Sequence, residues 1–398
     1  MLKSRLIKLT IPTNWSDELI SVVNRETVDV FYGKLSSDFL GGGRPSYCVP
    51  QVSSRDAIAH IRKIKNAGFR FNYLLNSTCL DNIEWTAKGQ RKLRALLEWI
   101  ISTGAQEVTV AIPYLLEVVK KSFSSLRVCV STSAKVNSPE RARYWQDLGA
   151  DVITLDSVVA NRNFGLMRRI RAAVNCELQV IANVNCLANC SLRNYHCSGI
   201  SHASQAGHPC RGFFVDYSHL MCSYERIIDP VNIIRGDWIR PEDLGKYEAV
   251  GIDRVKLVDR NMPTEILSKI INAYVRRRYD GNLLDLFPSP QKTFMHKKFG
   301  FIHKARYFFR PLLINPFKLL KAKELRSDFF YIDNRSLDNF LDFFLHNDCA
   351  ALSCEKCGYC QSVADKTVVF DRNLQQKFIR EYGSFLDELI SGTVFRYP

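Results

Sequence analysis

The sequence lacks the features that would place the protein in a membrane or outside the cell. It contains no run of about 18 consecutive apolar residues, the length that a transmembrane helix needs. Residues 1–9 carry three basic side chains but no apolar run, so we expect no secretory signal peptide. Low-complexity tracts are absent, and 46% of the residues are hydrophobic, which excludes the composition of a disordered chain. These absences predict a globular protein of the cytoplasm.

Acidic residues are scarce relative to basic ones. The chain has 40 Asp and Glu against 55 Lys and Arg, for a formal charge of +15. This excess favours an anionic partner, such as RNA, an acidic small molecule or an anionic membrane surface, although a solvated basic surface also explains it. Residues 291–326 hold ten Lys or Arg and one Glu among many aromatic residues. We expect this segment to bind single-stranded RNA, to contact a membrane surface or a partner, or to pack its aromatic side chains on the protein.

A glycine-rich phosphate-binding fingerprint is missing after the first predicted strand, which argues against a doubly wound nucleotide-binding sheet. Gly41-Gly42-Gly43 follows the second strand instead and is interpreted as a flexible loop. Eight short segments rich in β-branched residues alternate with helix-like segments, which predicts an α/β fold, a (β/α)8 TIM-like barrel. The predicted strands are residues 6–10, 28–32, 69–76, 107–113, 127–132, 151–156, 178–183 and 255–259.

Three regions are predicted along the chain. Residues 1–286 form the barrel, with a cysteine-rich insert at about 184–238 after the seventh strand. Residues 287–326 are a basic, aromatic-rich linker or helical segment. Residues 327–398 are a small C-terminal region that contains further cysteines and ends in a helix near 373–390. Because the loops that follow barrel strands form the active face, the insert is expected to be functional.

The chain has 13 cysteines, which in a reducing compartment indicate metal binding or catalysis rather than disulfides. Thiolates hold iron–sulfur clusters or zinc. His196 and His202 lie within the insert, so a mixed Cys/His zinc site is an alternative to a cluster. The radical-SAM spacing C-x3-C-x2-C would need a third cysteine at position 193, where this chain has Arg193. We therefore do not expect radical-SAM chemistry. The insert cysteines are Cys186, Cys190, Cys197, Cys210 and Cys222.

A second cysteine group lies in the C-terminal region. Cys354, Cys357 and Cys360 have the spacing of a ferredoxin-like run, and Cys349 precedes them by five residues. Gly358 supplies the tight turn that such a run needs. The group predicts a second cluster, half of a zinc site, or ligands that complete the first site, and a reduced surface turn is the simplest alternative.

Polar residues lie near the predicted strand ends. Asn72 and Asn183 lie toward the ends of the third and seventh strands, and Lys256 and Arg260 share one face at the eighth. If that face is the barrel interior, both cations point at the site mouth, where they could bind a carboxylate or a phosphate. A salt-bridged lysine and a helix-start arginine are the alternative. We take these four residues as candidate catalytic residues. No Ser/His/Asp or Cys/His triad can be assigned.

Three stretches together resemble the peptidase U32 family, the collagenase-like peptidases: residues 185–193 (NCLANCSLR), 238–244 (WIRPEDL) and 251–260 (GIDRVKLVDR). The resemblance covers about residues 5–280. It implies a barrel whose cysteines hold a [4Fe-4S] cluster and an oxygen-independent hydroxylase of RNA pyrimidines or quinone precursors, with prephenate as oxygen donor. It also implies that a partner protein of the same family is used by some members. Older members carry a protease label.

The insert departs from the usual family spacing, because only three residues separate its first two cysteines. The resemblance implies Cys186, Cys190 and Cys222 as cluster ligands, with Cys210 or Cys197 as the fourth. We therefore predict an iron–sulfur hydroxylase or related redox enzyme acting on RNA or an acidic small molecule, with Lys256 and Arg260 binding the acidic donor. A U32-type peptidase is the first alternative, and a non-catalytic RNA- or partner-binding protein with a structural metal site is the second.

Overall fold

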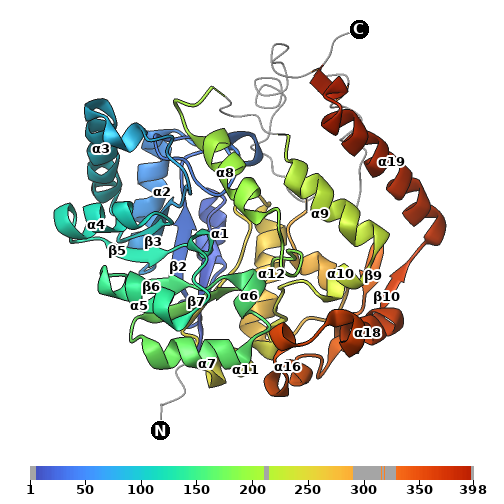
Figure 1. Cartoon of the computed structure of the whole chain (residues 1–398). Helices are drawn as coiled ribbons and strands as arrows, with labels where there is room; N and C mark the ends of the chain where they lie inside the picture. The colour runs from blue at the N-terminus through green and yellow to red at the C-terminus, as the bar shows by residue number, and fades with distance from the viewer. Residues whose placement is uncertain (1–5, 210–214, 290–314, 316–317, 319–328, 396–398) are drawn as a thin grey trace.

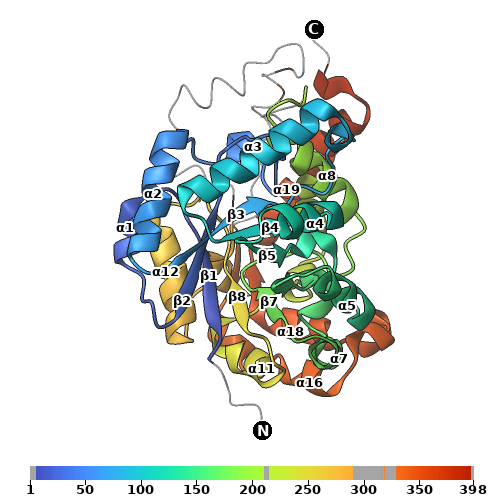
Figure 2. The same ribbon diagram turned by 90° about the vertical axis from the view of Figure 1, so that its left-hand side faces the viewer.

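Eight parallel strands form a closed barrel in chain order in the computed structural model, which describes residues 6–209, 215–289, 315, 318 and 329–395. Every strand overlaps one of the predicted segments, so the predicted (β/α)8 barrel is confirmed (Figures 1 and 2). The strands are β1 (Lys8–Pro12), β2 (Val28–Gly33), β3 (Arg70–Leu75), β4 (Glu107–Val110), β5 (Arg127–Val130), β6 (Val152–Thr154), β7 (Glu177–Ile181) and β8 (Arg254–Lys256).

Helices follow the strands and surround the barrel (Figure 2). Ser138 caps α5 by accepting a hydrogen bond from the Arg141 backbone N–H, and Pro139 is the first residue of the helix. Helix α3 buries Leu93 and Leu97 against the strands. The helices of this layer are α1 (Asp17–Ser21), α2 (Ser54–Asn66), α3 (Ala87–Thr103), α4 (Pro113–Ser122), α5 (Pro139–Asp147), α6 (Ser157–Ala160), α7 (Phe164–Ala173), α11 (Leu244–Ala249) and α12 (Thr264–Arg276).

The barrel interior contains buried polar pairs. Arg254 on β8 forms an ion pair with Glu107 on β4, with 3.2 Å between Nη1 and Oε2. The Gln179 side chain on β7 donates a hydrogen bond to the Thr154 hydroxyl on β6 at 2.8 Å. Buried polar groups are stable only when they are paired, so these contacts fix how β4, β6, β7 and β8 close around the interior.

The insert after β7 contains helices α8 (Arg193–Ser204), α9 (Tyr217–Ile228) and α10 (Val231–Ile234). Helix α8 lies over the end of the barrel at which the strands finish (Figure 1). Two contacts hold it there: Arg193 pairs with Asp156, which follows β6, and the Ser204 hydroxyl accepts a hydrogen bond from the Gly42 N–H at 2.7 Å. The insert therefore packs on the end of the barrel at which the strands finish.

The C-terminal region packs on the barrel and shares its hydrophobic core. Trp238 stacks on Phe340, and the buried Arg240 side chain binds Asp243, the Asn334 carbonyl and Asp338. Helix α19 runs beside α9 (Figure 1). The elements are an antiparallel pair, β9 (Phe330–Ile332) and β10 (Val368–Phe370), with helices α16 (Asp342–His346), α17 (Cys354–Cys357), α18 (Tyr359–Thr367) and α19 (Arg372–Ile390). The predicted final helix corresponds to α19.

The basic, aromatic-rich segment 291–326 lies outside the described residues, apart from Asn315 and Lys318. Lys318 forms an ion pair with Glu388 of α19 at 3.0 Å. The RNA, membrane and packing alternatives for the segment therefore stay predictions. Among the helices that the structure describes, none combines the length and apolar character needed to cross a bilayer.

Candidate functional site

Lys256 and Arg260 meet at the end of the barrel where the strands finish. Lys256 is the last residue of β8, and its Nζ lies 3.9 Å from the centre of the Tyr32 ring on β2. Arg260 is buried, and its Nη1 has no hydrogen-bond partner among the described residues. Burial lowers the pKa of Lys256 to about 8, and repulsion by the Arg260 guanidinium acts in the same direction. Both predicted cations thus belong to one site, which we call the barrel mouth.

Two further cations at the barrel mouth, Lys34 and Arg44, were missed by the sequence reasoning. Lys34 follows β2 and forms a buried ion pair with Asp38 at 3.0 Å. The Arg44 Nε donates a hydrogen bond to the Asp259 carboxylate at 2.6 Å. Burial lowers the pKa of Lys34 to about 8, although Asp38 opposes the shift, and the Asp259 carboxylate raises the pKa of Arg44.

The loop that carries Arg44 contains the glycine run that the sequence analysis interpreted as flexible. In the structure it is packed, because Gly41 and Gly42 are buried against α8. A Cβ atom on Gly42 would stand 2.9 Å from the Asn76 Oδ1 and 3.1 Å from the Lys34 Cδ. Only glycine lets the backbone come this close, so the run brings Arg44 to the barrel mouth. The position of Arg44 directly after the glycine run is the sequence signal that could have identified it as a residue of the site.

The charges at the barrel mouth do not balance. The four cations Lys34, Arg44, Lys256 and Arg260 face the two carboxylates Asp38 and Asp259, which leaves two positive charges in excess. Burial lowers the pKa of Arg260, the cation with an unused donor, and Asp259 opposes the shift. Such an excess in a buried site attracts a ligand with two negative charges.

The two candidate asparagines are engaged in contacts within the protein. Asn72 donates to Glu107 and accepts from the Thr109 hydroxyl at 2.8 Å, deep in the barrel. Asn183 donates to the carbonyls of Val258 and Leu286 and accepts from the Val258 N–H at 2.6 Å. Asn183 therefore holds the backbone just before Asp259 and Arg260. The catalytic roles assigned to both asparagines stay predictions.

Three of the insert cysteines come together. Burial raises the pKa of Cys186 and of Cys190, and the Cys222 thiol adds to the shift of both. Cys186 is held by a hydrogen bond from its N–H to the Asp237 carboxylate at 2.7 Å. Cys197 lies elsewhere on α8, with its Sγ 4.0 Å from the Ser133 hydroxyl. Cys210, the other predicted fourth ligand, lies outside the described residues.

Cys222 has the electrostatic surroundings of a thiolate. Burial alone would raise its pKa, but Arg226, whose Nη2 is 3.6 Å from the sulfur, and a hydrogen bond with His219 outweigh burial. The pKa of Cys222 is lowered to about 7. Asp216 caps α9 by accepting the His219 N–H at 2.9 Å and also pairs with His196 at 3.0 Å. A thiolate in this position suits a metal ligand or a nucleophile.

His202 belongs to a different group from the insert cysteines. Its Nε2 lies 3.3 Å from Asp81, and its ring stacks on His208 with 4.6 Å between centroids. The ligand atoms of Cys79, Asp81 and His202 all lie within 4.8 Å of one another. This trio could hold a zinc ion. The sequence pointed to His202 as a possible zinc ligand, but it did not point to Asp81, which lies in the loop after β3.

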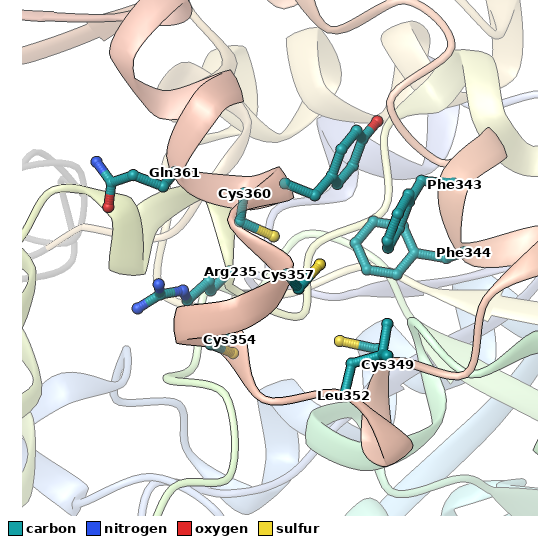
Figure 3. Close-up of a pocket in the computed structure, with 10 residues that line it drawn as sticks. Arg235, Phe343, Phe344, Cys349, Leu352, Cys354, Cys357, Cys360 and Gln361 are labelled. Carbon is teal, nitrogen blue, oxygen red and sulfur yellow. The ribbon is translucent and has the colours of Figure 1, made fainter.

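The second cysteine group lines one pocket (Figure 3). Cys349 belongs to the 3₁₀ turn Cys349–Ala351, Cys354 and Cys357 begin and end α17, and Cys360 lies in the first turn of α18. Gly358, between the two helices, has a φ of 62°, the left-handed conformation that the predicted tight turn needs. The structure thus adds Cys349 to the three predicted cysteines.

Comparisons with known proteins relate the sequence to one family. The sequence profile of Peptidase family U32 matches residues 77–280, more than half of the chain. An uncharacterized protease of Methanocaldococcus jannaschii is 29% identical over 346 residues, which is 87% of this chain and 90% of that protein. Among solved structures, a U32 peptidase is 23% identical with a TM-score of 0.49, covering 65% of this chain and 95% of its own. Phosphoribosyl anthranilate isomerase from Thermus thermophilus is 11% identical with a TM-score of 0.36, covering 68% and 98% respectively.

Proposed function

The chain belongs to peptidase family U32, and we propose that it is an iron–sulfur redox enzyme, an oxygen-independent hydroxylase that takes oxygen from an acidic organic donor. The observation that carries the proposal is the barrel mouth. Arg260 Nη1 is buried there without a hydrogen-bond partner among the described residues, in a site with two positive charges in excess. A buried, unused cationic donor is costly unless a ligand completes it, and a dicarboxylate supplies acceptors and charge of the required sign.

The residues of the barrel mouth have distinct roles in this proposal. Arg260 and Lys34 bind the two carboxylates of the donor. Arg44 holds Asp259, whose Oδ1 also accepts the Arg260 N–H at 2.7 Å, so this pair keeps the Arg260 backbone in place. Lys256, with its pKa near 8, holds a proton at Nζ that it can give to or take from the donor near neutral pH.

The insert thiols fit the cluster that the family implies. The Cys222 thiol acts electrostatically on both Cys186 and Cys190, and the cations of Arg193 and Arg226 oppose the rise in the pKa of both. These three thiols would hold the cluster, together with a fourth ligand such as Cys210 or Cys197. Bound there, a [4Fe-4S] cluster would supply one-electron redox chemistry. Arg193 ties this group to the barrel mouth through its pair with Asp156.

The test measures binding of prephenate to the anaerobically purified full-length chain by calorimetry. We expect Lys34→Met and Arg260→Gln each to weaken binding by about 30-fold, because each removes a charged hydrogen bond worth about 2 kcal/mol. Lys269→Gln is the matched control, since Lys269 is exposed and pairs with Asp285 on the outer layer. Unchanged binding in both mouth variants, or no binding by the wild-type chain, would reject the acidic donor.

A cysteine peptidase is a second candidate, favoured by the surroundings of Cys222. Its pKa near 7 and its hydrogen bond with His219 resemble a nucleophile with its base. Peptide cleavage that survives iron chelation and is lost in Cys222→Ala but not in Cys186→Ala would favour this candidate over the hydroxylase. Loss of all activity on chelation would favour the hydroxylase.

A further inference from the structure

We propose that Cys349, Cys354, Cys357 and Cys360 hold a second [4Fe-4S] cluster, separate from the one proposed for the insert. All four thiols line a single pocket. The sulfur atoms of Cys349, Cys357 and Cys360 turn toward one shared space (Figure 3). Cys354 belongs to the same group, because it lines this pocket at the start of α17, the helix that Cys357 ends.

The spacing and separation of the thiols favour a cluster over a single ion. Three ligands in a Cys-x2-Cys-x2-Cys run with a fourth from outside the run is an iron–sulfur pattern. A tetrahedral zinc ion with bonds of about 2.3 Å would hold its four sulfurs about 3.8 Å apart. Among the described residues, ligand atoms gathered within 4.8 Å of one another occur at Cys79, Asp81 and His202 and not at these thiols. A four-iron cube spaces its ligands further apart than one ion does.

A buried cation beside the pocket matches the negative charge of such a cluster. Arg162 donates from Nη2 to the Gly236 carbonyl at 2.8 Å, while its buried Nε and Nη1 have no hydrogen-bond partner. Its guanidinium attracts the thiolate forms of Cys349 and Cys360. Arg235 lines the pocket and also has a buried Nε without a partner. Arg235 Nη1 pairs with Asp229 at 3.9 Å, and four thiolates around a cluster would supply acceptors for the unpaired nitrogens of both arginines.

Aromatic side chains close the other side of the pocket. Phe343, Phe344 and Tyr359 line it, and the Phe343 and Tyr359 rings stack with 4.1 Å between centroids. The Arg162 guanidinium lies 5.3 Å from the Phe344 ring centre, so it is held between this wall and the barrel. An apolar shell excludes water from a cluster and lowers the local dielectric, which sets its potential.

The two cysteine groups lie on either side of one short stretch of backbone. Asp237 accepts the N–H of Cys186 in the insert, and Arg235, two residues earlier, lines the C-terminal pocket. Helix α10, which Arg235 caps, packs on α18, the helix that carries Cys360. The second cluster would thus stand next to the first without sharing a ligand among the described cysteines.

The test counts iron and acid-labile sulfide in the full-length chain after anaerobic reconstitution. We expect about eight irons in the wild type and about four in both Cys357→Ser/Cys360→Ser and Cys186→Ser/Cys190→Ser. Cys176→Ser is the control, because Cys176 lies outside both groups, and it should keep all the iron. Full iron content in the C-terminal double variant, or zinc without sulfide in the pocket, would overturn the second cluster.

This result separates the two proposals. If only the insert variant keeps the full iron content, the insert cluster fails and the C-terminal one stands. Should the C-terminal variant not fold, mass spectrometry of alkylated wild-type chain replaces it. The four C-terminal thiols should be protected in the reconstituted protein and modified after the iron is removed. Equal modification before and after removal would refute the proposal.

Discussion

The two cysteine groups differ in what surrounds them. The insert thiols lie among ionisable side chains that include Arg226, His219 and Asp237, whereas the C-terminal thiols line a pocket walled by Phe343, Phe344 and Tyr359. As a result, the pKa of Cys222 is lowered to about 7, while burial raises that of Cys360 to about 11. The contrast teaches that spacing identifies a thiol group, but its neighbours decide its reactivity. The insert group suits chemistry at the barrel mouth, and the C-terminal group suits a protected centre.

The largest expected effect comes from separating the C-terminal region from the barrel. Arg240→Ala removes a buried cation that binds Asp243, the Asn334 carbonyl and Asp338, and it leaves Asp243 with Lys246 as its remaining partner. We expect a loss of about 3 kcal/mol in the free energy of unfolding, measured by urea denaturation.

The comparison predicts that this change exposes the C-terminal thiols more than the insert thiols, as judged by their alkylation. Arg335→Ala is the control, since among the described residues the Arg335 side chain pairs at the surface with Asp280, and its loss should leave the unfolding midpoint in place. An unchanged midpoint in Arg240→Ala would show that the region does not depend on this anchor.

The next effect is a difference in thiol reactivity in the metal-free chain. At pH 7 about half of Cys222 but very little of Cys360 is thiolate, given pKa values of about 7 and 11. Because a lower pKa also weakens the nucleophile, we expect iodoacetamide to modify Cys222 about a hundredfold faster. Arg226→Leu should remove much of this advantage. Equal modification rates for Cys222 and Cys360 would contradict the proposed difference in thiol reactivity between the two cysteine groups.

A smaller effect concerns pH at the barrel mouth. Burial lowers the pKa of Lys34 and of Lys256 to about 8, so both are charged below pH 8 and lose their protons above it. Binding of an anionic donor should therefore be strongest below pH 8 and fall about tenfold per pH unit for each lysine above it. Calorimetry between pH 6.5 and about 9.5 measures the slope, which Lys34→Met should reduce. A flat profile would contradict the role of the lysines.

The smallest effect comes from a site distant from both cysteine groups. Ser138→Ala removes the N-cap of α5, and we expect a loss of about 1 kcal/mol by thermal unfolding. Iron content and prephenate binding should not change. A loss of iron in this variant would mean that cluster content reports overall stability, and the cysteine variants would then need stability-matched controls.

Much of the architecture could be read from the sequence because it depends on local patterns. The eight strands, the cap at Ser138 and the turn at Gly358 follow from β-branched runs, a cap residue beside proline and a glycine. The glycine run before Arg44 was misread, because its packing depends on Asn76 and α8, which are distant in the chain.

The sequence by itself determined the barrel, the family and the existence of two cysteine groups, since periodicity and spacing are properties of neighbouring residues. Tertiary structure alone decided which groups meet. In the folded chain Lys34 and Arg44 lie at the barrel mouth with Lys256 and Arg260. His202 lies with Cys79 and Asp81 instead of with the insert cysteines. Arg162 lies close to the C-terminal thiols. These contacts bridge strands and loops far apart in the chain, and the charge and burial that set their chemistry exist only once the barrel has closed.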